Sequence, residues 1–261
     1  MTSPHEERNL QLSVGYGSLA LFGVSIGVLV WFLLARLDTQ EPLSDSIFRE
    51  LERATNGRGD ASATFNVLLL FVWGFLHSFM ARRRFKDRLQ KVLRPHLEPA
   101  VYSIVASAGL IAVCLLYRPI PREMYALEGG PALVVRLLFY AGWALFLYCF
   151  FHLDVLEVVG LRPIFRYLGG TARPSEPFRP TGPFLWVRHP VELAFLVAFW
   201  AAPRMTVGHL LFSSVMTLYT FLGIDHEDRR MLDMHGAGYA DYIKKVPQIL
   251  PRLVEIERQT L

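Results

Sequence analysis

The chain has 261 residues, of which 52% are hydrophobic and 19% are charged, and its formal net charge at pH 7 is +4. Its mean hydropathy is positive, and the charged residues lie between long neutral blocks rather than among the apolar residues. Such a chain has more apolar surface than a soluble core hides, which excludes an ordinary soluble domain and indicates a protein of the lipid bilayer.

Four neutral blocks in the first part of the chain predict membrane helices. Residues 10–35 and 61–81 carry no charge, and both blocks are longer than the roughly 18 apolar residues that distinguish a spanning helix from a buried one. Residues 99–117 and 137–153 are similar but shorter. We therefore expect four transmembrane helices within residues 10–153.

The last third of the chain predicts a less regular membrane segment. Residues 191–224 are apolar but are interrupted by Glu192, Pro203 and Arg204, a pattern typical of a helical hairpin or one broken helix. The expected fold is an all-α integral membrane bundle of about five to six transmembrane helices, without a Rossmann domain. We expect one membrane domain, 1–261, with helices in 10–153, a cytoplasmic loop segment in 154–190, and a helical hairpin and tail in 191–261.

Basic residues indicate the orientation in the membrane. The densest basic run, residues 82–94, directly follows the second predicted helix, and short loops of this kind stay in the cytoplasm. The preceding loop, residues 36–60, is richer in acidic residues, as a translocated loop can be. Counting the crossings places both termini and residues 154–190 in the cytoplasm. A basic run beside a membrane helix indicates topology or an anionic-lipid contact, so we expect no nucleic-acid partner.

Three polar motifs flank the predicted hairpin. Each motif alone is typical of a headgroup anchor, a solvated helix face or an interfacial tyrosine. A hairpin brings its two ends together, so a cation, an imidazole, two carboxylates and two phenols are expected to converge, which suits a small zwitterionic ligand with an aromatic group. The motifs are Arg188-His189-Pro190, Glu227-Asp228, and Gly236 to Pro247 with Tyr239 and Tyr242.

The order and spacing of these motifs resemble the isoprenylcysteine carboxyl methyltransferase superfamily. Within it the chain is most similar to the bacterial methanethiol S-methyltransferase family, which groups near the NnrU-like membrane proteins. Residues 76–82, 151–154, 160–162 and 198–212 carry this second resemblance.

The resemblance implies that the hairpin and tail bind S-adenosyl-L-methionine in a bacterial inner membrane. By analogy, Arg188 and His189, followed by Pro190, contact the carboxylate or sugar edge of the cofactor. Glu227 holds its amino group or ribose, and Tyr239 and Tyr242 enclose it.

Some positions depart from the pattern of this superfamily. Glu192 and Ala194 stand where a tyrosine and a glycine are usual, and Asp228 replaces a second glutamate. Glu192 is the largest departure, because a carboxylate at the start of a membrane hairpin is costly unless it is solvated, paired or functional.

Methyl transfer from a sulfonium to a thiol requires a thiolate, whose formation a nearby base or cation assists. The candidate catalytic residues are His77, His152, Asp154 and Glu192, and the alternative for each is a structural role at an interface. His152 and Asp154 are two residues apart, so they do not face each other on a helix and are not automatically a dyad.

The sequence therefore predicts a membrane S-methyltransferase that converts a small thiol, methanethiol, to dimethyl sulfide. Two alternatives stay open, a methyltransferase for a prenylcysteine carboxylate or other lipophilic acceptor, and a non-enzymatic NnrU-like membrane protein.

We expect no metal, because the histidines show no H-x-x-x-H or H-E-x-x-H spacing. Cys114 and Cys149 lie in apolar blocks and are expected to be reduced packing residues. The oligomeric state stays open.

The predicted orientation places Lys86 in the cytoplasm. A cysteine introduced there (Lys86→Cys) is expected to react with a membrane-impermeant maleimide only after cells are opened, with the unsubstituted protein as control. Mass spectrometry measures the labelled fraction, and labelling in intact cells would contradict the orientation.

Overall fold

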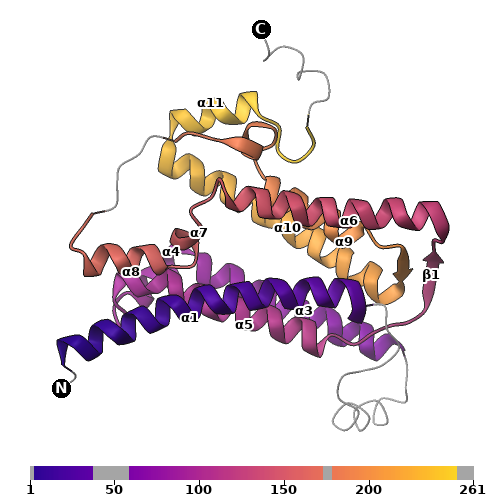
Figure 1. The fold of residues 1–261 in the computed structure, drawn as a ribbon, viewed down its shortest axis with the longest axis horizontal. Helices are drawn as coiled ribbons and strands as arrows, with labels where there is room; N and C mark the ends of the chain where they lie inside the picture. The colour runs from indigo at the N-terminus through magenta and orange to yellow at the C-terminus, as the bar shows by residue number, and fades with distance from the viewer. Residues whose placement is uncertain (1–2, 38–58, 173–177, 252–261) are drawn as a thin grey trace. The chain divides into compact units, whose positions relative to one another are not determined.

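The computed structural model describes residues 3–37, 59–172 and 178–251, which form helices joined by short connections (Figure 1). The chain divides into two compact units. The first contains Met1–Met124, Asp154–Pro174 and Thr206–Phe212, and the second contains Tyr125–Leu153, Ser175–Met205 and Ser213–Leu261. The domain boundaries drawn from the sequence stay a prediction.

The first unit contains most of the N-terminal helices. Its described elements are α1 (Pro4–Trp31), the π-helix η1 (Phe32–Arg36), α3 (Gly59–Ala81), α4 (Arg83–Leu89), the 3-10 helix η2 (Pro95–Leu97), α5 (Glu98–Leu116), α7 (Val155–Val158) and α8 (Leu161–Leu168).

The second unit contains α6 (Gly129–Phe150), the 3-10 helix η3 (Gly182–Leu185), α9 (Pro190–Trp200), most of α10 (Val207–His235) and α11 (Ala237–Lys245). Two short strands, β1 (Glu123–Ala126) and β2 (Arg204–Thr206), pair into a two-stranded sheet. These strands are an addition to the predicted all-α fold, which is otherwise confirmed.

Five helical segments are long and apolar enough to cross a membrane: Pro4–Arg36, Ala61–Ala81, Pro95–Leu116, Gly129–Phe150 and Val207–His235. The chain is thus a multi-pass membrane protein. The fourth segment differs from the predicted range 137–153, because the helix continues toward the N-terminus through Arg136 and ends before His152. Both cysteines are free and buried, as expected.

The predicted hairpin at residues 191–224 consists of two unequal helices. α9 has 11 residues, and a helix of this length reaches only about 16 Å, short of the roughly 30 Å hydrocarbon core. α10 has 29 residues and extends beyond its apolar part into a charged end that begins at Asp225. Only the second arm of the hairpin is therefore long enough to span.

Two predicted loops fall partly outside the described residues. Of the loop at 36–60, residues 38–58 lie outside them. In the glycine- and proline-rich stretch 168–183, residues 173–177 also lie outside, and 169–172 and 178–181 form no helix. The segment 154–190, predicted as a loop, contains the short helices α7 and α8.

Helix α1 packs against α5 and α8 within the first unit (Figure 1). The hydroxyl of Ser18 donates to the carbonyl oxygen of Val159 at 2.7 Å. At the far end, buried Arg36 donates to the carbonyl oxygens of Cys114 at 3.3 Å and Leu115 at 3.1 Å. These carbonyls are near the end of α5, where a cation is favourable, so Arg36 ties the two helices together.

Small residues bring α6 and α9 together in the second unit. A Cβ atom on Gly142 would lie 3.0 Å from the carbonyl oxygen of Ala194, and Ala194 and Ala198 are fully buried. Close approach of backbones through small residues is the usual way that membrane helices gain packing energy. The contact sets the position of α9, whose first turn carries Glu192.

Gly160 permits the tightest backbone approach of the first unit. Its φ is +80°, and a Cβ atom would lie 2.2 Å from the backbone nitrogen of Ala100. Gly160→Ala is therefore expected to lower the free energy of unfolding by about 3 kcal/mol, through backbone strain and displacement of α5. Thermal unfolding in detergent measures the loss.

Gly17→Ala is the matched control, since a Cβ on Gly17 meets nothing within 4 Å and alanine favours a helix. Equal unfolding temperatures for the two variants would contradict the role of Gly160.

Candidate functional site

Asp228, in the charged end of α10, is the centre of a polar network in the second unit. Its carboxylate accepts hydrogen bonds from Arg188 Nη2 (3.0 Å), His189 Nε2 (2.9 Å), the Tyr239 hydroxyl (2.6 Å) and Gln248 Nε2 (3.4 Å). Because a carboxylate only accepts, His189 carries a proton on Nε2. The network joins all three motifs that the sequence places around the hairpin.

Local backbone structure brings these residues to Asp228. Pro190 begins α9, where a missing N–H costs nothing. The N–H groups of Arg188 and His189 donate to the carbonyl oxygens of Pro247 at 2.8 Å and Gln248 at 3.1 Å. Gly236, with a φ of +54°, makes the turn from α10 to α11, and this turn returns Tyr239 to Asp228.

Most hydrogen-bond donors of the Arg188 guanidinium bind other groups of the protein. Nη1 donates to the carbonyl oxygens of Ile243 at 3.3 Å and Val246 at 2.8 Å, near the end of α11, and Nη2 pairs with Asp228. Among the described residues, buried Nε has no hydrogen-bond partner. Arg188 therefore holds α10 and α11 in place with three of its five N–H groups.

Three aromatic rings pack together beside this network. Phe178 lies 5.2 Å from Tyr239 and 5.1 Å from Tyr242, measured between ring centroids. Burial raises the pKa of Tyr242 to about 12. Burial and the hydrogen bond to Asp228 raise the pKa of Tyr239 well above its usual range. Both phenols therefore remain protonated donors at neutral pH.

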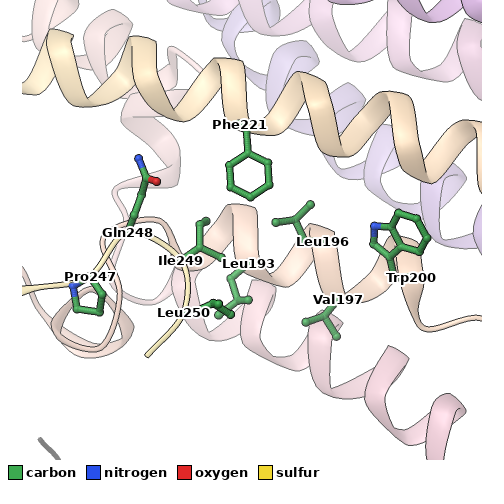
Figure 2. Close-up of a pocket in the computed structure, with 9 residues that line it drawn as sticks. All are labelled: Leu193, Leu196, Val197, Trp200, Phe221, Pro247, Gln248, Ile249 and Leu250. Carbon is green, nitrogen blue, oxygen red and sulfur yellow. The ribbon is translucent and has the colours of Figure 1, made fainter. Parts of the chain in front are cut away.

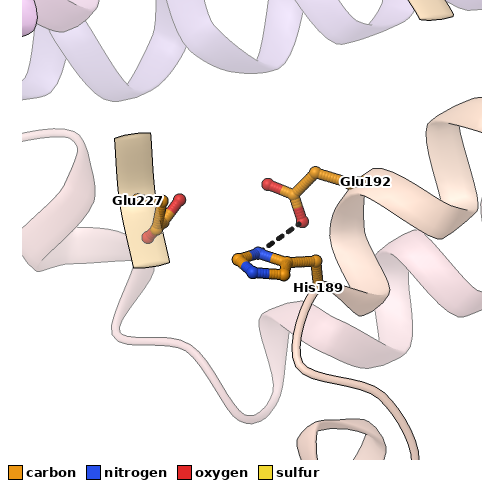
Figure 3. Close-up of side chains that lie close together, drawn as sticks. All are labelled: His189, Glu192 and Glu227. Carbon is orange, nitrogen blue, oxygen red and sulfur yellow. Dashed lines mark ion pairs between the residues drawn. The ribbon is translucent and has the colours of Figure 1, made fainter. Parts of the chain in front are cut away.

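A second cluster, of one imidazole and two carboxylates, lies on the other side of His189. One ligand atom from each of His189, Glu192 and Glu227 lies within 4.8 Å of the others (Figure 3). His189 Nδ1 lies 3.9 Å from Glu192 Oε2. The Glu227 side chain is 44% exposed and pairs with Arg230. We call these three residues the His189 cluster.

The other predicted catalytic residues lie elsewhere in the chain. His152 Nδ1 lies 3.2 Å from the Thr181 hydroxyl. Its ring also fills the space that a Cβ on Gly182 would need. His77 belongs to the first unit, where its Nε2 lies 3.0 Å from the Tyr102 hydroxyl.

Asp154 has a structural role at the start of α7. Its carboxylate accepts from the N–H of Glu157 at 3.2 Å and pairs with Arg162.

Sequence reasoning did not assign a role to Asp228, Gln248 or Phe178. The signal for Asp228 was present in the Glu227-Asp228 pair, because consecutive helical residues point about 100° apart and only one of them faces inward. Asp228 faces inward, with 14% of its side chain exposed. Gln248 directly follows the motif that runs from Gly236 to Pro247, whereas no local pattern indicated Phe178.

An open apolar pocket of about 670 Å³ lies next to the network. Leu193, Leu196 and Trp200 line it from one face of α9, and Phe221 lines it from α10 (Figure 2). Gln248 lines the pocket and also donates to Asp228. An apolar compartment therefore adjoins the charged site.

Together these features define a multi-pass membrane protein with a polar site on the charged end of one helix and no Rossmann sheet in the described residues. Sequence comparison identifies its family. The chain is 34% identical to Methanethiol S-methyltransferase 1 of Bradyrhizobium diazoefficiens, over 78% of this chain and 72% of the relative. It is 32% identical to the Methanethiol S-methyltransferase of Mycobacterium tuberculosis, over 94% of this chain and 97% of the relative.

The chain therefore belongs to the methanethiol S-methyltransferase family, and is a methyltransferase that requires a methyl donor. It is also 27% identical to Nurim of Sus scrofa, over 64% of this chain and 66% of that protein. No family model and no solved structure matches the chain.

The network predicts that Asp228 stabilises the fold through Arg188. Asp228→Asn leaves a largely buried guanidinium without its anion, so we expect the free energy of unfolding to fall by about 3 kcal/mol. Asp228→Glu keeps the charge and is expected to lose less. Thermal unfolding in detergent measures both changes.

Asp233→Asn is the control, because this carboxylate is exposed on the same helix and its loss is expected to change stability by less than about 0.5 kcal/mol. Equal stability of Asp228→Asn and this control would show that Asp228 does not support the fold.

Proposed function

We propose that this protein transfers a methyl group from S-adenosyl-L-methionine to methanethiol and releases dimethyl sulfide. The observation that carries the proposal is the relationship to the Mycobacterium tuberculosis Methanethiol S-methyltransferase, which extends over 97% of that relative. The site supports it with polar and aromatic residues that suit the methyl donor and an apolar pocket that suits the thiol.

The residues of the site fit this methyl donor. The cofactor supplies an electrophilic methyl group on a positively charged sulfur. The rings of Phe178, Tyr239 and Tyr242 offer aromatic faces for its adenine or its cationic sulfur. Buried Arg188 Nε, which has no partner among the described residues, offers a donor.

The assigned cofactor residues divide into contacting and positioning residues. We assign Glu227 to the ammonium or ribose of the cofactor, since its carboxylate is accessible. His189 and Arg188 act mainly through Asp228, because their hydrogen bonds to it hold residues 188–190 in place. Pro190 fixes the start of α9.

The structure favours one of the four candidates for accepting the proton of the thiol. The Asp154 carboxylate caps α7 and pairs with Arg162. His77 lies within hydrogen-bonding distance of the Tyr102 hydroxyl in the first unit. Glu192 lies in the His189 cluster, and the next residue, Leu193, lines the apolar pocket. We therefore assign proton acceptance to Glu192, with His152 as the alternative.

A membrane location suits these two reactants. A small apolar thiol partitions into the bilayer and reaches the site through the apolar pocket beside α9. The charged cofactor enters from the cytoplasm, the side that the basic residues 82–94 assign to the C-terminal motifs. In a bacterial cell this membrane is the inner membrane.

A second acceptor class is favoured by the size of the pocket. Methanethiol, with one carbon and one sulfur, occupies a small part of about 670 Å³. An acceptor with a longer apolar chain, such as a prenylcysteine, fills more of this space, so a lipophilic acceptor is the second candidate.

Headspace gas chromatography tests the proposed reaction. Detergent-purified protein supplied with S-adenosyl-L-methionine and methanethiol is expected to release dimethyl sulfide. Glu227→Ala is expected to lose at least tenfold in rate, because the variant lacks a carboxylate assigned to the cofactor. Asp233→Asn is expected to keep the full rate.

Absence of dimethyl sulfide from protein that binds the cofactor would reject methanethiol as acceptor and favour the lipophilic class. Absence of cofactor binding would reject the methyltransferase mechanism itself.

A further inference from the structure

We propose that the His189 cluster binds a divalent transition-metal ion, which holds the sulfur of the thiol acceptor. The metal site stands on the geometry of His189, Glu192 and Glu227. Its part in the reaction rests on the proposed function. An imidazole nitrogen with two carboxylate oxygens is a ligand set for zinc, iron or manganese.

The separation between His189 and Glu192 suits one shared ion. Two ligands about 2.1 Å from a metal lie about 3.4 Å apart at a tetrahedral angle and about 4.2 Å apart when opposite each other. His189 Nδ1 and Glu192 Oε2 are 3.9 Å apart, inside this range and too far for a hydrogen bond. The three ligand atoms lie within 4.8 Å of one another, so a small rotation of the accessible Glu227 side chain completes the set.

His189 is prepared as a ligand by its surroundings. The residue is 3% exposed, and its Nε2–H donates to Asp228 at 2.9 Å. That hydrogen bond leaves the lone pair on Nδ1, the atom that faces Glu192 (Figure 3). Metal-bound histidines almost always donate their other N–H to a carboxylate or carbonyl, which orients the ring. Asp228 is itself held by Arg188 and Tyr239.

The charges around the cluster also favour a bound cation. Glu192 and Glu227 place two carboxylates where a thiolate must form, and like charges raise the cost of forming that anion. A divalent ion between them offsets their two negative charges, and metal coordination deprotonates a thiol and activates it as a nucleophile. The same carboxylates that oppose a bare thiolate then serve as ligands.

The proposed reaction transfers one proton and one methyl group. The thiol S–H bond breaks, a metal–sulfur bond forms, and the proton passes to the oxygen of Glu192 that does not bind the metal. The sulfur then uses an electron pair to form the new S–CH₃ bond, and the electrons of the old bond return to the sulfur of the methyl donor. Coordination through one oxygen of Glu227 leaves its other oxygen for the cofactor.

The cofactor's ammonium group is the competing cation. Two acceptors that share one ammonium lie about 4.6 Å apart for hydrogen bonds of about 2.8 Å, which is longer than the separation of 3.9 Å between His189 and Glu192. The histidine spacings considered in the sequence did not indicate this site, because Glu227 comes from another helix.

Cobalt and zinc binding to full-length, detergent-purified protein test the proposal. After chelator treatment, one equivalent of Co²⁺ is expected to give visible d–d bands, and methanethiol is expected to add a thiolate-to-cobalt band in the near ultraviolet. Glu192→Gln and Glu227→Gln are each expected to weaken Zn²⁺ binding at least tenfold by calorimetry. Asp233→Asn is expected to bind Zn²⁺ like the parent protein, and thermal unfolding verifies that each variant is folded.

Absence of stoichiometric Co²⁺ and Zn²⁺ binding, or unchanged affinity in folded Glu192→Gln and Glu227→Gln, would overturn the metal site. Dimethyl sulfide production by chelator-treated protein without bound metal would overturn the proposed role in the reaction while the proposed function stands. Metal binding that both substitutions weaken, in a protein that makes no dimethyl sulfide, would support the site and reject the function.

Discussion

The ion pair between Asp228 and Arg188 is the interaction on which the site depends. It joins the segment before α9 to the charged end of α10, at 3.0 Å. Arg188 also donates to two carbonyl oxygens at the C-terminal end of α11, those of Ile243 and Val246. A largely buried guanidinium requires its anion and its hydrogen-bond acceptors together. One arginine and one aspartate therefore hold three chain segments in register, and His189, Tyr239 and Gln248 use the remaining acceptor capacity of the same carboxylate.

Close packing of α6 against α9 fixes the position of the residues around this ion pair. Gly142 lets α6 approach the backbone of α9 closely, so the first turn of α9 has little freedom to move. α9 is also too short to span a membrane, and the polar residues at its start lie beside apolar ones. Glu192 thus lies next to His189 on one side and next to the pocket residue Leu193 on the other, a position that a regular spanning helix would not provide.

The site combines two environments that methyl transfer to a volatile thiol requires. The charged end of α10 and the rings of Phe178, Tyr239 and Tyr242 suit a polar methyl donor, and the pocket beside α9 suits an apolar acceptor. Gln248 belongs to both, because it lines the pocket and donates to Asp228. Family membership supplies the reaction class, whereas the arrangement of these residues supports particular roles for them.

Sequence alone determined what depends on local pattern. Neutral blocks such as 61–81 indicated spanning helices, because the bilayer imposes length and hydropathy on each segment separately. The three motifs around the hairpin were also expected to meet, since any hairpin joins its ends.

Only the tertiary structure decided which side chains face one another. Rotation about the axis of α10 places the Asp228 carboxylate against Arg188 and leaves the Glu227 side chain 44% exposed, although the two residues are adjacent in the chain. Asp154 serves as a helix cap, His77 lies in the first unit, and Glu192 meets His189 and Glu227 across two helices. Such contacts join residues distant in the sequence, and packing geometry rather than composition determines them.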